Sequence, residues 1–386
     1  MRVRAVRATP VNVPMVAPYR FSFGLLGSFT TTIVEVEDED GVVGIGETPH
    51  GDLAAEVDRL GAVLTGVGID DLNGCEQRVL SHTGFSLWSD SSTTRRAFGG
   101  IEIALWDLRA RREGRPLVEL LGGRVRDEVP FTEYFALRHG VEETPEAVVA
   151  YCERMADEHG SPWFEGKLGV LRVREELAMV RALSASLGEG LLRLDANGAY
   201  TVATARRVTA ELAALGIGWL EDPCRTLDET ARLRADGQPV SFSTHEPDLG
   251  RAARTGVPDA FCLDAAELGG IRRTQDFLRA CEAFGIDFWC YSGDAGIMTA
   301  VYLHLTAAEP SLIRPHQSLF RFTSDLVVEQ GRYSPRNGVL PVPDGPGLGV
   351  SIDRAALVRL HERYRSEGAM ATGVEGERYS AEYRRL

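Results

Sequence analysis

Positive charge is scarce in this chain of 386 residues. It carries 42 Lys and Arg residues against 56 Asp and Glu residues, so its formal net charge is −14 at pH 7. Proteins that bind nucleic acid or anionic membranes present basic patches, and this balance argues against both partners. A small anionic ligand is still compatible with it, because a single site can be positive inside an acidic protein.

Signals for membranes and export are also missing. No apolar run reaches the ~18 residues that suggest a transmembrane helix. The N-terminal ten residues are basic, but the apolar core of a signal peptide does not follow them. The six cysteines contain no CxxC pair, and in a chain of this length they indicate reduced thiols. We therefore expect a cytoplasmic protein with a small-molecule partner.

The first 125 residues have the pattern of an α+β unit. Alternating and β-branched residues predict strands over residues 2–13, 30–36 and 42–47. The stretch 14–29, rich in Gly, Pro and aromatic residues, is expected to be a loop between the first two strands. Helical patterns follow over 53–64 and 93–112. These elements predict one compact N-terminal domain.

From residue 126 to about 330, short apolar strands alternate with helices. The expected strands cover residues 129–135, 163–168, 191–196, 218–221, 240–245, 260–264, 287–291 and 312–316. Helical patterns lie between them, for example over 145–159, 173–187, 201–215 and 272–284. Eight strand–helix steps predict an α/β fold of the (β/α)8 TIM-barrel type. The remainder is expected to be loop-rich and then helical over 353–365.

Polar residues end most of these strands. The second to the seventh strands end in Glu165 and Lys167; Arg193, Asp195 and Asn197; Glu221 and Asp222; Ser243 and His245; Asp264; and Tyr291. Active sites of (β/α)8 barrels lie at the carboxyl ends of the strands, so these side chains should converge. Strand alternation turns Ser243 and His245 toward the barrel interior and Phe242 toward the helices.

Two of these carboxylates suggest a metal. Asp195 and Glu221 end adjacent strands, and buried carboxylates that face each other are unfavourable unless a cation joins them. This predicts a divalent metal on Asp195 and Glu221, with His245 as the third ligand by strand parity. The competing interpretation is a structural ion network in which the carboxylates pair with Arg193 or Lys167. The sequence does not separate the two.

At this point the motifs resemble those of the enolase superfamily, in particular its mandelate racemase and acid-sugar dehydratase branches. The similarity extends over the whole chain and is carried by residues 103–108, 114–123, 194–198, 220–223, Asp264 and 269–270. It implies an N-terminal capping domain (1–125), a modified barrel (126–330) and a C-terminal segment (331–386) that returns to the cap. It also implies Mg2+ on three carboxylate-type ligands, a homo-oligomer, and abstraction of the proton α to a carboxylate.

Several positions depart from the family's pattern. The second strand usually carries two lysines, and here Glu165 precedes Lys167. The seventh-strand position usually held by a histidine is Tyr291. The third metal ligand, usually Glu, Asp or Asn, is His245 or Thr244. A histidine ligand would widen the preference from Mg2+ to Mn2+ or another divalent ion.

Lys167 is the expected base, since a nearby cation and burial would both depress its pKa. The alternative role for Lys167 is to balance the charges of Glu165 and Asp195. Tyr291 is a candidate acid, a base on the opposite face or a packing aromatic, with Asp264 to orient it. His50 in the cap and His316 at the eighth strand are candidate acids for a leaving hydroxide.

Substrate contacts are expected from Tyr19 and Arg20 in the first long loop and from Glu165, Asn197 and Tyr134 at strand ends. Asn197 has the alternative role of a turn residue. The resulting hypothesis is a metal-dependent lyase that dehydrates an acid sugar to a 2-keto-3-deoxy acid. A racemase, epimerase or cycloisomerase of a carboxylate substrate is the alternative, and a non-catalytic family member that binds a small acid is a third.

Overall fold

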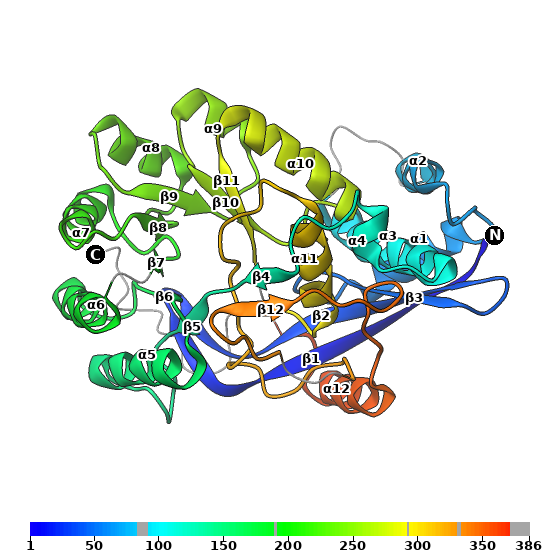
Figure 1. Ribbon diagram of the computed structural model, residues 1–386, viewed down its shortest axis with the longest axis horizontal. Coiled ribbons are helices and arrows are strands. Elements are labelled where there is room, and N and C mark those ends of the chain that lie inside the picture. The colour runs from blue at the N-terminus through cyan, green and yellow to red at the C-terminus, as the bar shows by residue number, and fades with distance from the viewer. Residues whose placement is uncertain (83–91, 189–190, 292, 330–332, 371–386) are drawn as a thin grey trace.

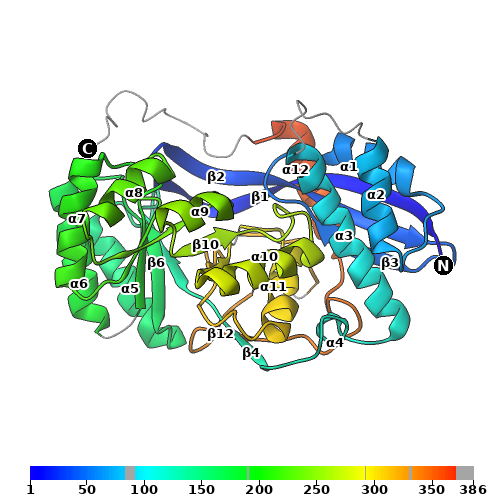
Figure 2. The same cartoon turned by 90° about the horizontal axis from the view of Figure 1, so that it is seen from above.

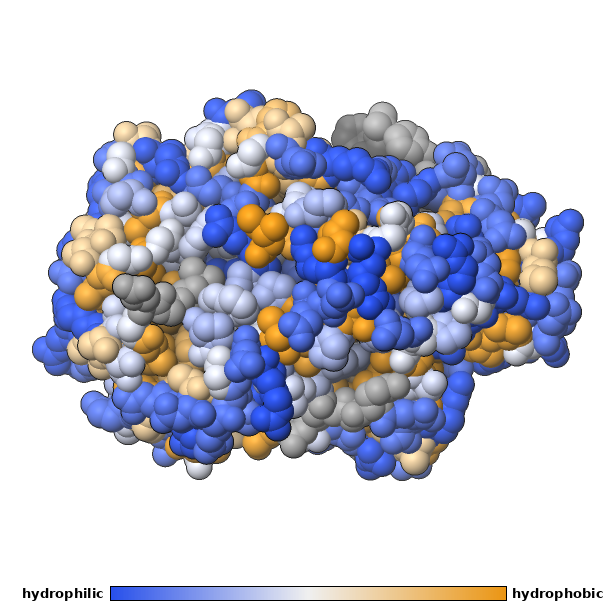
Figure 3. Space-filling view, viewed as in Figure 1, coloured by the Kyte–Doolittle hydropathy of each residue, from blue (hydrophilic) through white to orange (hydrophobic). Residues whose placement is uncertain are grey.

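The structure of the chain is a computed structural model, and it describes residues 1–82, 92–188, 191–291, 293–329 and 333–370. Two parts lie side by side in Figure 1, a sheet with helices near the N-terminus and a ring of strands and helices. The face shown in Figure 3 is mostly hydrophilic, with apolar residues scattered over it. None of the described helices is long and apolar enough to cross a membrane.

The N-terminal part is a three-stranded antiparallel sheet covered by helices. Its elements are β1 (Val3–Phe21), β2 (Gly24–Asp38), β3 (Val43–Glu47), α1 (Ala54–Leu64), α2 (Leu72–His82), α3 (Ser92–Glu113) and α4 (Leu117–Leu120). Val3, Val34 and Val36 of the sheet share an apolar core with α1 and α3. The predicted strands and the two predicted helices are therefore present, but β1 and β2 extend well beyond their predicted ends.

The predicted loop over residues 14–29 is wrong. β1 and β2 continue as one long hairpin, in which Tyr19 pairs with Leu26 and Phe21 with Gly24. The register shifts between Pro14 and Tyr19, and this irregularity accommodates the Pro-containing stretch that had indicated a loop. Figure 2 shows the hairpin running from the N-terminal helices across to the barrel.

The second part is a curled parallel sheet in the order β11-β10-β9-β8-β7-β6-β5. Its strands are β5 (Glu133–Phe135), β6 (Trp163–Lys167), β7 (Leu191–Asp195), β8 (Trp219–Glu221), β9 (Ser241–Thr244), β10 (Ala260–Leu263) and β11 (Asp287–Cys290). The surrounding helices are α5 (Pro145–His159), α6 (Val173–Leu187), α7 (Val202–Ala214), α8 (Leu227–Ala235), α9 (Leu249–Thr255), α10 (Ile271–Phe284) and α11 (Ile297–Ala308). The predicted α/β barrel is confirmed in a modified form.

The eighth predicted strand, 312–316, forms only a bridge. His316 bridges Phe131, and its N–H donates to Pro130 O at 2.9 Å. On the other side, Gln317 N donates to Cys290 O at 3.1 Å, so this segment joins the two edges of the sheet. Pro315 has no N–H to donate, which limits a longer ladder here.

Glutamates from the N-terminal part hold two barrel helices. Glu47, at the end of β3, accepts hydrogen bonds from Ala295 N (2.6 Å) and Met298 N (3.1 Å) at the start of α11. Glu102 of α3 accepts from Ile271 N at 2.7 Å at the start of α10. Carboxylates are favourable at helix N-termini, so these contacts fix the sheet domain against the barrel.

The C-terminal segment contains β12 (Val339–Pro341), which pairs with β4 (Glu128–Pro130), and α12 (Arg354–Glu367). α12 lies against β1 in Figure 1, and Asn12 Nδ2 donates to Glu367 Oε2 at 3.1 Å. The end of the described chain thus returns to the first strand.

Candidate active site

A cavity of about 200 Å³ lies at the carboxyl ends of the barrel strands, below the β1–β2 hairpin. Its lining residues are Tyr19, Phe21, Phe23, Leu26, Lys167, Asn197, His245 and Tyr291. A larger cavity of about 710 Å³ adjoins it and shares Phe23, Asn197 and His245. Five of the predicted site residues therefore border one small space.

Lys167 and Asp195 form an ion pair at this cavity. Their strands place them side by side, and Lys167 Nζ contacts Asp195 Oδ2. Asn197 completes the arrangement, because its N–H donates to Asp195 Oδ1 at 2.7 Å and its Nδ2 donates to Oδ2 at 2.9 Å. Asn197 has a φ of 43°, a left-handed conformation that Asn tolerates and that turns its amide back toward the carboxylate. Asn197 orients Asp195 in addition to lining the cavity.

The expected depression of the Lys167 pKa is not what the structure shows. Burial lowers this pKa, but Asp195, with smaller contributions from Tyr19 and Glu221, outweighs burial and raises it. The expectation assumed a cation beside the lysine, whereas here the neighbouring groups are anionic. A neutral amine at this position therefore requires that a positive charge compensate Asp195.

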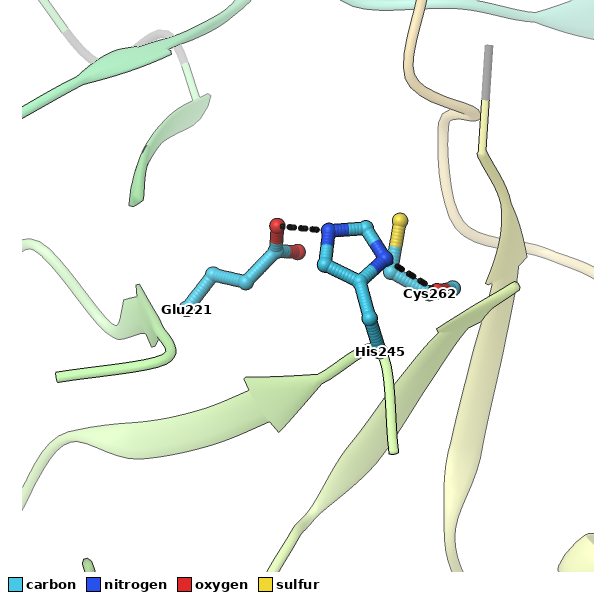
Figure 4. Close-up of side chains that lie close together, drawn as sticks. All are labelled: Glu221, His245 and Cys262. Atoms are coloured by element: carbon cyan, nitrogen blue, oxygen red, sulfur yellow. Dashed lines mark hydrogen bonds and ion pairs between the residues drawn. The ribbon is translucent and has the colours of Figure 1, made fainter. Parts of the chain in front are cut away.

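Glu221 and His245 form a second pair. His245 Nε2 lies 2.9 Å from Glu221 Oε1, and His245 Nδ1 contacts Cys262 O at 2.7 Å (Figure 4). Burial lowers the pKa of His245, but Glu221 outweighs it and raises this pKa to about 10. Ser243 also reaches Glu221, at 3.3 Å from Oε2, so the predicted alternation along this strand is confirmed.

The donor set fits a divalent cation. Asp195 and Glu221 are register neighbours on β7 and β8, and both are completely buried. Glu221 Oε1 is buried and pairs with His245 Nε2 at 2.9 Å. The two ion pairs correspond to the ion-network interpretation, but they bring two buried carboxylates together at adjacent strand ends, and a divalent cation would supply the charge that such a pair needs.

Thr244 does not point to this cluster. Its Oγ1 donates to Asp222 Oδ1 at 2.6 Å and accepts from Glu246 N at 3.2 Å. Glu246 is a carboxylate that the sequence reasoning missed, although it directly follows His245. It lines the larger cavity, and its carboxylate lies 3.0 Å from Arg251 Nη1. Its residue type and its place beside His245 make it a second candidate for the third ligand.

Tyr291 and His50 meet where the two parts of the molecule join. Tyr291 lines the small cavity, and its hydroxyl lies 3.4 Å from His50 Nδ1. His50 Nε2 donates to Gly293 O, and the ring stacks on Phe29 with centroids 4.5 Å apart. Burial lowers the pKa of His50 to about 4, so it is neutral at neutral pH. The Asp264 carboxylate is oriented by backbone, accepting from Ala266 N at 2.6 Å.

Of the other predicted substrate contacts, some lie on the face of β1 that borders the cavity and one lies on the opposite face. Tyr19 lines the cavity and packs edge-on against Tyr134, with ring centroids 6.0 Å apart. The Tyr134 ring in turn lies 5.9 Å from Lys167 Nζ. Arg20 is absent from the cavity lining among the described residues, and its charge acts on Glu143 near the start of α5. Alternation along β1 accounts for this, because Tyr19 and Arg20 face opposite sides.

Glu165 and His316 lie deeper, in the barrel interior. Glu165 pairs with Arg193 and also accepts from Thr132 (3.1 Å) and Gln317 (2.9 Å), so both of its oxygens are occupied. His316 accepts from Cys290 N at 2.8 Å, and its other ring nitrogen contacts a threonine hydroxyl at 2.6 Å. Neither residue has a free polar atom for a substrate, so we do not retain the predicted roles of substrate ligand and acid.

One sequence signal for the site was overlooked. Of the 42 Lys and Arg residues, Lys167 is the only lysine in the chain. Arginine remains charged at all working pH values, whereas lysine can lose its proton. Every other Lys or Arg position of the chain is an arginine, so the single lysine indicates a position where a group that can lose its proton is needed.

Comparisons with known proteins identify the family of the chain. Residues 3–122 match the family model for the mandelate racemase / muconate lactonizing enzyme N-terminal domain, and residues 147–356 match the enolase C-terminal domain-like model. A probable glucarate dehydratase of Streptomyces coelicolor is 31% identical over 94% of this chain and 92% of its own length. A D-galactarolactone cycloisomerase of Agrobacterium fabrum is 28% identical over 93% and 99%.

Solved structures are similar over nearly the whole chain. An enolase from Mycobacterium smegmatis complexed with tartrate has a TM-score of 0.87 and 30% identity, covering 95% of this chain and 93% of that one. An enolase from Thermobispora bispora complexed with magnesium and formate has a TM-score of 0.86 and 31% identity, covering 95% and 94%. The family depends on Mg2+. The chain belongs to the enolase superfamily, whose members are lyases and isomerases.

Proposed function

We propose that the chain is a divalent-metal-dependent dehydratase of an acid sugar. It would remove the proton α to the carboxylate and eliminate the β-hydroxyl as water, which gives a 2-keto-3-deoxy acid. The observation that carries the proposal is the position of Lys167, the only lysine, between Asp195 and the cavity that Tyr291 also lines. The dehydratase relative at 31% identity supports the choice of reaction.

Asp195, Glu221 and His245 would hold the metal, with Glu246 as the alternative to His245. Mg2+ is the expected ion because structural neighbours carry it, and Mn2+ is compatible with a histidine ligand. When bound, the ion supplies positive charge where negative charge develops on the substrate carboxylate. That positive charge also offsets Asp195, which otherwise keeps Lys167 protonated.

Lys167 Nζ is the proposed base. It takes the α-proton as a neutral amine, and Asn197 keeps Asp195 in place while it does so. The leaving hydroxyl needs one proton to depart as water, and Tyr291 Oη is the proposed donor. Since His50 Nε2–H is committed to Gly293 O, Nδ1 accepts the Tyr291 hydroxyl hydrogen at rest, and this hydrogen would turn to the leaving oxygen during the reaction. The proton taken by Lys167 then restores the phenol, so the reaction consumes no net proton.

A cycloisomerase is the second candidate, and the cap side of the cavity favours it. Tyr19, Phe21, Phe23 and Leu26 line this side. A polyhydroxylated substrate finds few hydrogen-bonding groups among them, whereas an unsaturated or cyclic acid packs well against aromatic rings. A chloromuconate cycloisomerase of Cupriavidus pinatubonensis is 30% identical over 92% of this chain.

A substrate screen separates these functions. Mono- and diacid sugars, sugar lactones and muconates are incubated with the enzyme and Mg2+ or Mn2+ in D2O. A 2-keto acid product establishes the dehydratase. Lactone opening or closure without a 2-keto acid establishes the cycloisomerase, and deuterium uptake without net change indicates a racemase or epimerase. Silence in every assay, with no deuterium in any acid, would favour the non-catalytic binder.

The Lys167→Arg variant is the matched control for the screen. It keeps the positive charge beside Asp195 but removes a group that can be deprotonated. Product formation and deuterium uptake should both disappear in this variant and in wild type treated with a chelator. Undiminished deuterium uptake by the variant would exclude Lys167 as the base.

A further inference from the structure

Three neighbouring strands bring different donor atoms together beside the cavity. Glu221 ends β8, His245 follows β9 and Cys262 lies in β10. One ligand atom from each, a carboxylate oxygen, an imidazole nitrogen and the thiol sulfur, lie within 4.8 Å of one another (Figure 4). Glu221 and Cys262 are completely buried, and His245, whose side chain is 34% exposed, borders both cavities.

An ion pair and a backbone contact hold the side chains of this cluster in place. The buried Glu221 Oε1 pairs with His245 Nε2 at 2.9 Å. The carbonyl of Cys262 holds His245 Nδ1 at 2.7 Å, and this contact directs Nε2 to Glu221. A backbone carbonyl on the other ring nitrogen is the usual way in which a protein orients a metal-binding histidine.

We propose that Glu221, His245 and Cys262 form a second coordination site for a soft divalent cation such as Zn2+ or Co2+. Oxygen, imidazole and thiolate donors are the set that these ions take, usually with tetrahedral geometry. Mg2+ does not use sulfur, so it would remain on the proposed site of Asp195 and Glu221 with His245 or Glu246. The fourth position of the soft ion is open to water.

Binding would release protons and exclude Mg2+. The ion forms bonds to Oε1, Nε2 and Sγ, while the thiol proton and the proton shared by His245 and Glu221 leave to solvent. Because both ions require Glu221, the chain holds one or the other. The competition, but not the ligand set, rests on the proposed role of Glu221 in the function above. Zn2+ would then act as an inhibitor that Mg2+ reverses.

Cobalt spectroscopy tests the site without any enzyme assay. Co2+ is added to the metal-free full chain, and we expect a thiolate-to-cobalt charge-transfer band in the near ultraviolet. Cys262→Ser should remove this band and weaken Zn2+ binding by more than about tenfold. Cys224→Ser is the matched control, since Cys224 is a buried thiol that lines the larger cavity together with His245, and it should leave the band unchanged.

Two outcomes would overturn the proposal: no charge-transfer band in wild type, or a band that survives in Cys262→Ser. X-ray absorption of the Zn2+-loaded wild type gives the same answer if the variant does not fold, because it reports whether sulfur lies in the first shell. A cobalt band in a chain that shows no activity would support this metal site and contradict the proposed function. Activity in a chain that shows no cobalt band would support the proposed function and contradict this metal site.

Discussion

The same two strands carry two ion pairs of opposite polarity, one layer apart. β6 contributes Glu165 to the inner pair and Lys167 to the outer pair, and β7 contributes Arg193 and Asp195 respectively. The inner pair is closed: Thr132 and Gln317 occupy the oxygens of Glu165, and the guanidinium lies 3.9 Å from the Trp289 ring. The outer pair borders a cavity.

The two ion pairs differ in function because the inner pair contains an arginine and the outer pair a lysine. Arg193 cannot release its proton, so the inner pair holds the barrel together in one state. Lys167 can release its proton once the charge of Asp195 is compensated, so the outer pair can change state during a reaction. The inner pair therefore serves stability and the outer pair serves chemistry. Variants of the inner pair should change mainly the stability of the fold, and variants of the outer pair should change mainly the activity.

Loss of the outer lysine should have the largest effect. Lys167→Arg removes the proposed base, and we expect kcat to fall by about 10²- to 10⁴-fold. The melting temperature should change little, because the positive charge beside Asp195 is kept. Steady-state kinetics and thermal unfolding measure the two effects. A wild-type kcat in the Lys167→Arg variant would show that another group is the base.

The inner pair should show the opposite pattern. Glu165→Ala leaves the guanidinium of Arg193 buried without its carboxylate, and we expect a loss of about 3–5 kcal/mol in the free energy of unfolding. Glu165→Gln keeps one acceptor oxygen, which can still take the hydrogen bonds from Thr132 and Arg193, and should lose less. Urea denaturation measures both. If Glu165→Ala were as stable as wild type but inactive, Glu165 would belong to the substrate site after all.

The protonation state of the outer pair can be read directly. Lys167 is the only lysine, so lysine labelled with 13C at Cε gives a single NMR signal from the whole chain. In metal-free protein this signal should titrate above the pKa of free lysine, since Asp195, Tyr19 and Glu221 outweigh burial. Addition of Mg2+ should lower that pKa. An unchanged titration would disprove the compensation of Asp195 by the ion.

Two histidines should contribute to stability with opposite pH dependence. Burial, with help from Arg193 and Arg126, lowers the pKa of His316 to about 3 from 6.5, so stability should fall as pH drops below 6.5. Glu221 outweighs burial and raises the pKa of His245 from 6.5 to about 10. Its contribution is complete below pH 6.5 and should be lost as pH rises through 10.

Unfolding free energies of metal-free protein from about pH 4 to about pH 10 test these signs. The difference between wild type and His316→Asn should shrink toward acid pH, and the difference between wild type and His245→Asn should shrink toward alkaline pH. If both differences in unfolding free energy shrank toward the same end of the pH range, the opposite pKa shifts of His316 and His245 would be contradicted.

Much of this arrangement follows from local sequence patterns. Period-two alternation places Ser243 and His245 on the inner face and Phe242 on the outer one, and the structure agrees. The polar residues at strand ends predict where the cavity lies, because parallel strands all end at the same rim. Composition alone predicted a loop over 14–29, and that failed because a register shift lets a Pro-containing stretch remain in a strand.

Other features depend on distances that no local pattern contains. The sequence by itself determined which side chains reach the rim of the barrel, since strand alternation and helix length are local properties. Only the tertiary structure decided their partners: Asp195 with Lys167 rather than Arg193, and Tyr291 with His50, which lies 241 positions away in the chain. The physical reason is that a pKa or a metal preference depends on charges within a few ångströms, and those charges come from separate strands and from both domains.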